Sequence, residues 1–304
     1  MVPDAATEHQ ATVTKRKPSE EAPEPNPVAQ IIATRTLQTL LVAFPVLIGL
    51  RAVLPPKRFR CLLRWGGPLV TAALSGYFAA TFHARSPLFS RLSGKENEFV
   101  THLPPDAGKA VALTFDDGPH PETTPYLLDV LKQYGAKATF FLVGERVSRW
   151  PEIVRRIADE GHAIGIHGLR HRTMVLQAPA QVRKDIGESV RRTETATGKQ
   201  LPFPYLLRPP YGFKTPTLGR TAGALGCRII AWSVDPRDYD GISADCLVKR
   251  LAREIAPGSI VLLHESPKSD LAARSLPGIL RLCRERGLDC CPLALENEPD
   301  NCYA

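Results

Sequence analysis

The chain has 304 residues, of which 43% are hydrophobic and 23% charged, so it is not disordered as a whole and is long enough for one large domain with appendages. Its net charge of +8 raises nucleic acid, anionic lipid and anionic glycan as partners. Basic and acidic residues are interspersed through the second half and no nucleic-acid recognition motif accompanies them, which argues against a nucleic-acid binder.

The N-terminal part predicts a disordered tail followed by a membrane-anchor region. Residues 1–30 are rich in proline and glutamate and poor in apolar residues, so they are expected to be disordered. Residues 31–85 contain two hydrophobic stretches. The first, 36–50, is short and contains a proline. The second, 65–82, is uncharged and close to the minimum of about 17–20 residues that crosses a bilayer.

The basic residues between the two hydrophobic stretches predict the orientation of the anchor. They are Arg51, Lys57, Arg58, Arg60 and Arg64. Whether one or both stretches span, this basic loop belongs in the cytoplasm and everything after Phe82 lies outside. The alternative is that both stretches are amphipathic or buried helices of a soluble protein. Residues 86–108, with several Ser, Gly and Pro, predict a linker to a folded domain at 109–304.

From residue 110 onward, short apolar segments alternate with helical patterns. The predicted strands are 110–115, 138–143, 163–166, 205–208, 228–233, 259–263 and 288–293. The predicted helices are 124–134, 152–160, 180–197, 216–225, 243–255 and 270–286. This alternation predicts an α/β fold with a parallel sheet covered by helices. A flavodoxin-like open sheet and a small closed barrel both fit the pattern.

In either architecture, functional residues are expected where the parallel strands end, in the loops that lead into helices. Nearly every polar residue suited to catalysis follows a predicted strand. These residues are Asp116, Asp117, His167, His171, Arg208, Asp235, Asp238, His264 and Glu265. We therefore expect them to gather on one rim of the sheet.

Two histidines and a carboxylate on this rim predict a metal site. His167 and His171 are four residues apart, so on a turn entering a helix both rings face the same way. With one aspartate of the adjacent pair, Asp116 or Asp117, they form a two-histidine, one-carboxylate set that leaves an open position on zinc for water. Cobalt or nickel would also fit these donors. His162 precedes its strand at the opposite end and is expected to be structural.

The remaining rim residues fit hydrolysis by a metal-bound water, whose pKa is lowered towards about 7. The second aspartate of the pair is a candidate base. His264 is a candidate acid that protonates the leaving group. Arg208 is expected to hold the base carboxylate, and Asp238 is expected to hold Arg208. Together these residues predict metal-assisted hydrolysis of an amide or ester.

Five motifs between Lys109 and Ala294 carry a resemblance to a known family. They are Thr114-Phe115-Asp116-Asp117-Gly118-Pro119, His167-Gly168-Leu169-Arg170-His171, Arg208-Pro209-Pro210-Tyr211, Asp238, and Leu262-Leu263-His264. With them the chain resembles the polysaccharide deacetylases of carbohydrate esterase family 4, the chitin, peptidoglycan and chitooligosaccharide deacetylases. The resemblance implies a distorted (β/α) barrel of seven or eight strands.

The resemblance also implies a role for each motif residue. It makes Asp116 the general base, and Asp117, His167 and His171 the metal ligands. By the same resemblance, Arg208 orients the base with Asp238 as its partner, and the backbone N–H of Tyr211 stabilises the oxyanion. Leu262 lines the pocket for the acyl methyl group, and His264 is the acid.

Three residues depart from the family pattern without removing a catalytic group. Gly168 stands where Ser or Thr is usual and lacks a hydroxyl that braces the histidines. Tyr239 replaces the customary Trp after Asp238, so the substrate pocket is expected to differ in width or polarity. Glu265 stands where Asp is usual.

The sequence therefore predicts a metal-dependent hydrolase, with zinc or another divalent metal such as cobalt, that removes acetyl groups from N-acetylated sugars of a cell-surface or extracellular polysaccharide. Its partners are expected to be the glycan and, through residues 31–85, the membrane, with the catalytic domain on the extracytoplasmic side. The alternatives are a deacylase of a lipid-linked sugar and a catalytically silent glycan-binding domain. The sequence does not indicate an oligomeric state.

Overall fold

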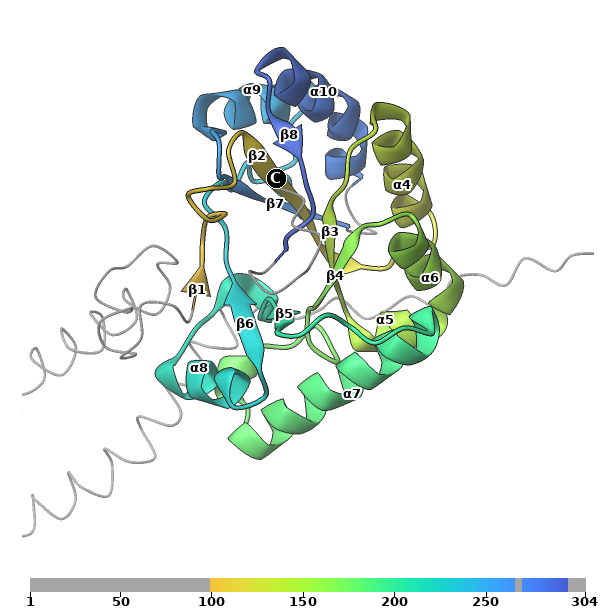
Figure 1. Cartoon of the computed structure of the whole chain (residues 1–304), viewed down its shortest axis with the longest axis vertical. Coiled ribbons are helices and arrows are strands. Elements are labelled where there is room, and N and C mark those ends of the chain that lie inside the picture. Colours follow the sequence, from red (N-terminus) through yellow and green to blue (C-terminus); the bar gives the residue numbers. More distant parts are fainter. Residues whose placement is uncertain (1–98, 266–269, 295–304) are drawn as a thin grey trace, which may run out of the picture. The chain divides into compact units, whose positions relative to one another are not determined.

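The structure is a computed structural model that describes residues 99–265 and 270–294 of the chain (Figure 1). The predicted disordered tail, both hydrophobic stretches and the linker up to residue 98 lie outside the described residues. Within the described ranges, no helix combines the length and the apolar character that a membrane crossing requires.

The described residues alternate strands and helices along the chain. The strands are β1 (Phe99–Val100), β2 (Ala110–Gly118), β3 (Thr139–Leu142), β4 (Ala163–Ile166), β5 (Tyr205–Leu207), β6 (Cys227–Ile230), β7 (Ile260–His264) and β8 (Asp289–Cys290). The α-helices are α4 (Thr123–Tyr134), α5 (Gly144–Arg149), α6 (Pro151–Asp159), α7 (Pro179–Thr197), α8 (Pro216–Gly223), α9 (Ala244–Glu254) and α10 (Leu271–Glu285). Two short 3₁₀ turns, Met174–Leu176 and Pro210–Gly212, complete the order.

Each predicted strand and each predicted helix corresponds to one of these elements, with ends shifted by a few residues. The last strand is much shorter than the predicted 288–293, because only Asp289–Cys290 pairs with β2. Two elements were not predicted, β1 and α5. β1 pairs with β6, and Leu103 and Ala107 are buried beyond it, so residues 99–108 pack against the sheet. The predicted linker 86–108 is therefore wrong over this last part.

The sheet is parallel, and β2 to β6 lie side by side in chain order. Its strands lie in the order β1-β6-β5-β4-β3-β2-β7, and β8 pairs with the start of β2. Beyond β6 the chain runs along β7, where Ser233 N–H donates to the Ile260 carbonyl at 3.0 Å and Leu262 N–H donates to the Val234 carbonyl at 2.9 Å. These bonds join the two sides of the sheet, so the described strands form a distorted barrel rather than the flavodoxin-like open sheet.

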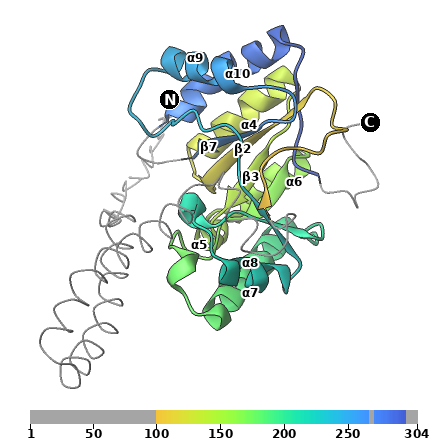
Figure 2. The ribbon, with the colours of Figure 1, turned by 90° about the vertical axis from the view of Figure 1, so that its left-hand side faces the viewer.

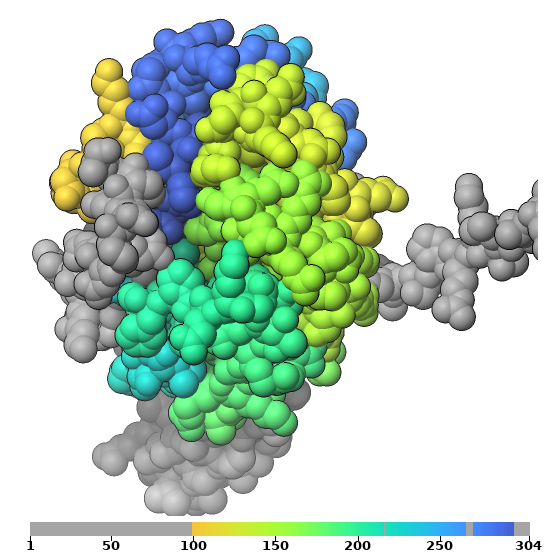
Figure 3. Space-filling view, turned by 45° about the vertical axis from the view of Figure 1, so that its right-hand side comes forward, coloured from red at the N-terminus to blue at the C-terminus, as the bar shows by residue number. Residues whose placement is uncertain are grey.

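The helices cover the outside of this sheet (Figures 1 and 2). α4, α6, α9 and α10 bury one apolar cluster against β2, β3 and β7. α7 and α8 bury a second cluster against β4, β5 and β6. On one face of the molecule, α10, α4, α6 and α7 follow one another, as the space-filling view shows (Figure 3).

The alternation of side chains along β2 determines which residues of the first motif point into the barrel. Its outward side chains join the cluster under the helices: Val111, Leu113 and Phe115. Its inward side chains begin with small residues that join a third cluster inside the barrel: Ala110 and Ala112. Because side chains alternate along a strand, Thr114 and Asp116 also point inward. The carboxylate of Asp116 therefore lies inside the barrel, near the carboxyl end of β2.

Candidate active site

Both carboxylates of the Asp116-Asp117 pair face one site because β2 contains a bulge. Asp116 lies opposite Phe141 and Gly118 opposite Leu142, so Asp117 is the extra residue. Its φ of 74° lies in the left-handed region that residues other than glycine rarely adopt. Without the bulge, neighbouring side chains would point to opposite faces. With it, Asp117 reaches the histidines after β4 while Asp116 stays on the inner face.

His167 and His171 follow β4 and turn their Nε2 atoms towards Asp117. The Oδ1 atom of Asp117 lies 3.3 Å from Nε2 of His167 and 3.1 Å from Nε2 of His171. On its other side, His167 donates its Nδ1–H to the backbone carbonyl of Arg208 at 2.8 Å. This bond fixes the tautomer, so in a neutral ring the lone pair of Nε2 faces the carboxylate.

The donor set fits a cation. One atom from each of Asp117, His167 and His171 lies within 4.8 Å of the other two. The Oδ1 atom of Asp117 is buried and has no hydrogen-bond partner among the described residues. Burial alone would raise the pKa of Asp117, but the two imidazoles outweigh it and hold this pKa well below its usual range. Three acceptors this close require shared positive charge, from protons on the rings or from a metal ion. Two nitrogens and one oxygen suit zinc or a similar divalent metal.

Asp116 pairs with Arg208, as predicted. The guanidinium is completely buried, and its Nη1 donates to Asp116 Oδ1 at 2.7 Å and to Thr114 Oγ1 at 2.7 Å. Its Nε and Nη2 donate to the carbonyls of Ile230 and Ala231 at 3.2 and 2.9 Å. Burial lowers the pKa of Arg208 from its usual value, and the Asp116 carboxylate opposes this shift. Such a buried ion pair is tolerated because its donors are satisfied.

Asp238 does not hold Arg208, which corrects the prediction from the sequence. It holds His264 instead. The backbone N–H of His264 donates to Asp238 Oδ2 at 2.7 Å, and its Nδ1–H donates to Asp238 Oδ1 at 2.8 Å. The loop after β6 runs beside β7 before it reaches Asp238, so this carboxylate arrives at the end of β7. Burial would lower the pKa of His264, but the bond and charge of Asp238 raise it to about 9.

Leu262 belongs to β7 and Tyr211 to the loop after β5. Leu262 is 4% exposed and pairs with Thr114, so it faces the inner side of β7. Tyr211, in the loop after β5, has a φ of 63° and packs its ring edge-on against His171 with centroids 4.5 Å apart. Its hydroxyl donates to the His171 carbonyl at 3.4 Å.

Tyr239 is exposed beside the candidate acid. Its side chain is 58% exposed, and its ring centroid lies 5.7 Å from that of His264. Its hydroxyl donates to Asp235 Oδ2 at 3.0 Å. Partial burial and the Asp235 carboxylate raise the pKa of Tyr239 to about 12. The aromatic face is therefore held in a fixed orientation at the edge of the site.

Glu265 and Arg146 adjoin the site, although the sequence analysis gave them no role. Glu265 is completely buried, accepts a hydrogen bond from the Thr124 hydroxyl and donates its N–H to the Asp116 carbonyl at 2.8 Å. Burial raises its pKa to about 8. Arg146 of α5 donates from Nη1 to the Asp117 carbonyl. The expectation that polar residues after each strand belong to the rim would have found Arg146, which follows a predicted strand.

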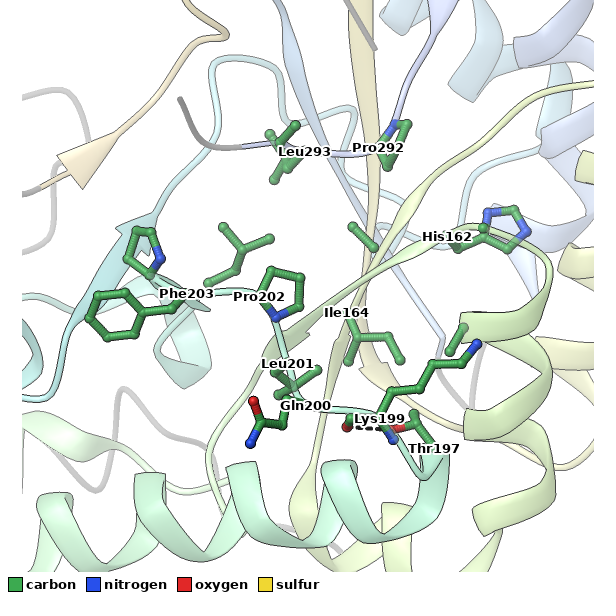
Figure 4. A pocket seen from close by; sticks show the side chains of 16 residues that line it. His162, Ile164, Thr197, Lys199, Gln200, Leu201, Pro202, Phe203, Pro292 and Leu293 are labelled. Atoms are coloured by element: carbon green, nitrogen blue, oxygen red, sulfur yellow. Dashed lines mark hydrogen bonds between the residues drawn. The ribbon is translucent and has the colours of Figure 1, made fainter. Parts of the chain in front are cut away.

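A cavity of about 350 Å³ lies away from this site, near the start of β4 (Figure 4). Its walls come from the start of β4, the loop after α7 and the chain after β8; they include Ile164, Leu201, Phe203 and Leu293. His162 also borders it and accepts a hydrogen bond from the Ala138 N–H at 3.2 Å. Burial lowers the pKa of His162 to about 4, so its neutral ring fits the expected structural role.

Comparison with known proteins identifies a family and several relatives of this chain. The family model for polysaccharide deacetylases matches residues 104–230. A chitooligosaccharide deacetylase of Bradyrhizobium sp. (strain ANU 289) is 35% identical over 197 residues, which cover 61% of this chain and 89% of that protein. A peptidoglycan-N-acetylglucosamine deacetylase of Bacillus cereus is 41% identical over 163 residues, covering 53% of this chain and 58% of that protein.

Solved protein structures are also similar to this chain. The crystal structure of the Bc1960 peptidoglycan N-acetylglucosamine deacetylase is similar with a TM-score of 0.61 and 35% identity, covering 67% of this chain and 94% of that one. A family pseudoenzyme from Bacillus anthracis, BA3943, is similar with a TM-score of 0.58 and 27% identity, covering 64% and 66%. The resemblance inferred from the five motifs is confirmed. The chain belongs to the polysaccharide deacetylase family, carbohydrate esterase family 4, and its relatives that are named deacetylases are hydrolases of N-acetyl amide bonds.

Proposed function

We propose that this chain removes acetyl groups from N-acetylated sugars of a peptidoglycan- or chitin-type polysaccharide, with zinc held by Asp117, His167 and His171. The observation that carries the proposal is the convergence of these three side chains beside a separate Asp116–Arg208 pair and a separate Asp238–His264 pair. The names of the relatives, which are chitooligosaccharide and peptidoglycan deacetylases, support this substrate class.

When bound, the cation would polarise the acetyl carbonyl and lower the pKa of a water towards about 7. Asp116 is the base that takes the proton of this water. Its Oδ1 is held by Arg208, while its Oδ2 lies 3.9 Å from His167 Nε2, on the side of the three ligands. Arg208 therefore leaves the second carboxylate oxygen of Asp116 available as a base on the side of the three ligands.

His264 is the acid that gives a proton to the leaving amine. Its Nδ1–H is bound to Asp238, so the proton on Nε2 is the one available to the substrate. With a pKa raised to about 9, the ring is protonated at neutral pH. The backbone N–H of Tyr211 is the proposed donor to the oxyanion, Leu262 bounds the acetyl methyl, and Tyr239 offers an aromatic face to the sugar.

Release of acetate from chitooligosaccharides and from peptidoglycan fragments tests the proposal. Exhaustive chelation should abolish release and added zinc should restore it, whereas activity that survives chelation would count against the site. Asp116→Asn should lose turnover and keep zinc, and Asp117→Asn should lose zinc. Asp106→Asn, at an exposed position away from the rim, is the matched control. Equal zinc content in the two inactive variants would mean that the roles are assigned wrongly.

A lipid-linked sugar is the second candidate substrate, favoured by the hydrophobic stretches 36–50 and 65–82. We propose that they anchor the chain with the catalytic domain on the extracytoplasmic side. Protease treatment of intact cells would then remove a C-terminal tag, and a protected tag would contradict this orientation. Comparison of polymeric with polyprenyl-linked substrates separates the two substrate classes.

A silent glycan-binding domain would bind these glycans without releasing acetate, and the presence of acid, base and ligands argues against it.

A further inference from the structure

The first turn of α5 contacts both loops that carry the candidate metal ligands. The backbone N–H of Gly144 donates to the carbonyl of Gly168 at 2.9 Å, and the N–H of Glu145 donates to the carbonyl of Leu169 at 2.9 Å. Both carbonyls lie between the two histidines of the second motif. The Glu145 carboxylate also pairs with Arg170 of the same loop. This turn therefore holds the backbone of the loop 167–171 in place through hydrogen bonds.

The next residue of the turn, Arg146, reaches the first motif. The carbonyls on either side of Asp117 accept backbone hydrogen bonds, from Glu265 N–H to Asp116 and from Val143 N–H to Gly118, both at 2.8 Å. Asp117 is the extra residue of the bulge, which has no place in the ladder of backbone bonds. Its carbonyl accepts instead from Nη1 of Arg146. The side chain of Arg146 thus supplies the hydrogen bond that a backbone N–H supplies at the neighbouring positions.

The position of this turn is fixed by close packing. A Cβ atom on Gly144 would lie 2.9 Å from Ser189 Oγ of α7 and 3.1 Å from Leu169 Cδ1, so only glycine fits between α7 and the histidine loop. One turn later, Val147 is completely buried. The guanidinium of Arg146 is therefore carried by a backbone that has little freedom to shift.

We infer that Arg146 is a positioning residue for the metal site. It holds Asp117 in its left-handed conformation in the bulge and, through α5, keeps the Asp117 carboxylate close to the Nε2 atoms of His167 and His171. This inference rests on the proposed function. The left-handed backbone of a non-glycine residue is strained, and a hydrogen bond to a charged donor offsets this strain. If Arg146 is lost, Asp117 is free to relax and its Oδ1 leaves the two Nε2 atoms.

The sign of the effect on zinc affinity separates positioning from simple charge. A guanidinium near a cation site repels the cation, so removal of the charge alone would tighten zinc binding. Loss of a residue that orients a ligand weakens metal binding, commonly by about 10–100-fold. Positioning and charge therefore predict opposite changes for the same substitution.

The experiment measures zinc dissociation constants by competition with a chromophoric chelator for the whole protein and for Arg146→Ala, Arg146→Lys and Arg183→Ala. Arg183 is an exposed arginine of α7 and serves as the control. We expect zinc to bind Arg146→Ala at least about 10-fold more weakly than the unmodified protein. Arg146→Lys should fall between the two, and Arg183→Ala should be unchanged. Turnover of Arg146→Ala should fall with KM unchanged.

Zinc binding to Arg146→Ala that is unchanged or tighter would overturn the inference. If that variant fails to fold, Arg146→Lys carries the test alone, because it keeps the charge and loses the planar donor; affinity equal to that of the unmodified protein would then overturn it. Failure of the unmodified protein to bind zinc would instead refute the proposed function, so the two failures are distinct.

Discussion

Replacement of Asp238 by Asn tests how the acid is kept protonated. Asp238 accepts the backbone N–H of His264 at 2.7 Å and the ring Nδ1–H at 2.8 Å. An asparagine can keep the first bond with its oxygen, but then presents its NH₂ group to Nδ1. Without the carboxylate, burial lowers the pKa of His264, and only the weaker charges of Asp117 and Asp116 still raise it. The variant should therefore keep its loop and lose its protonated acid.

The magnitude follows from the pKa values. A return of the His264 pKa from about 9 to the ordinary histidine value of 6.5 would correspond to roughly 3 kcal/mol of lost interaction with the imidazolium. At pH 8 the protonated fraction falls from about 0.9 to about 0.03, a loss of about 30-fold in the active form. At pH 6 the same calculation gives a loss of less than about two-fold. The defect of Asp238→Asn is thus expected to grow with pH.

The assay is kcat/KM for acetate release between pH 5.5 and 10, with the unmodified protein and Asp238→Asn side by side. Stability gives an independent readout in metal-free protein. Since the folded-state pKa of His264 is raised, its contribution is complete below 6.5 and is lost as the pH rises through about 9. This decline should be absent in the variant. A loss of activity that is the same at every pH would refute the reasoning, because a general distortion of the site acts in that way.

Three further predictions concern the packing around the rim. Gly118→Ala should destabilise the fold by about 1–3 kcal/mol in urea unfolding, because its Cβ would lie 2.2 Å from Glu265 Oε1; the added change Glu265→Ala should recover part of this loss. Burial raises the pKa of Glu265 to about 8, so stability should fall as the pH rises from 4.5 to about 8, and Glu265→Gln should remove that dependence of the urea midpoint. Arg208→Met leaves Asp116 unpaired inside the barrel, which should cost about 3–5 kcal/mol and abolish turnover; a stable, active variant would contradict the assigned pairing.

The convergence of the rim residues could be predicted because it depends on a general rule. Parallel strands end on the same side, so Asp116, His167, Arg208 and His264 had to approach one another once their strands were recognised. The contact of Arg208 with Asp116 was expected for a related reason, because a guanidinium and a carboxylate that meet on one rim form a charge-assisted hydrogen bond. Periodicity and strand ends were sufficient for this part of the site.

The missed features depend on structure that leaves little trace in a single sequence. β1 has only two residues, too few for a recognisable alternation. α5 has six residues and buries only Gly144 and Val147, so it shows no helical stripe. The bulge at Asp117 is set by pairing with β3, and no local residue pattern requires it. The partner of Asp238 depends on how the loop after β6 runs beside β7.

The corrected partner of Asp238 changes how the site can work. Had Asp238 held Arg208, the arginine would have faced two carboxylates and His264 none. Burial, which lowers the pKa of His264, would then have acted without the carboxylate that raises it most, and a neutral imidazole is a poor acid for a leaving amine. The observed arrangement gives each catalytic group one partner of opposite charge: Arg208 for the base Asp116, and Asp238 for the acid His264. Acid and base can therefore have opposite charges within one rim at the same pH, which bifunctional catalysis of amide hydrolysis requires.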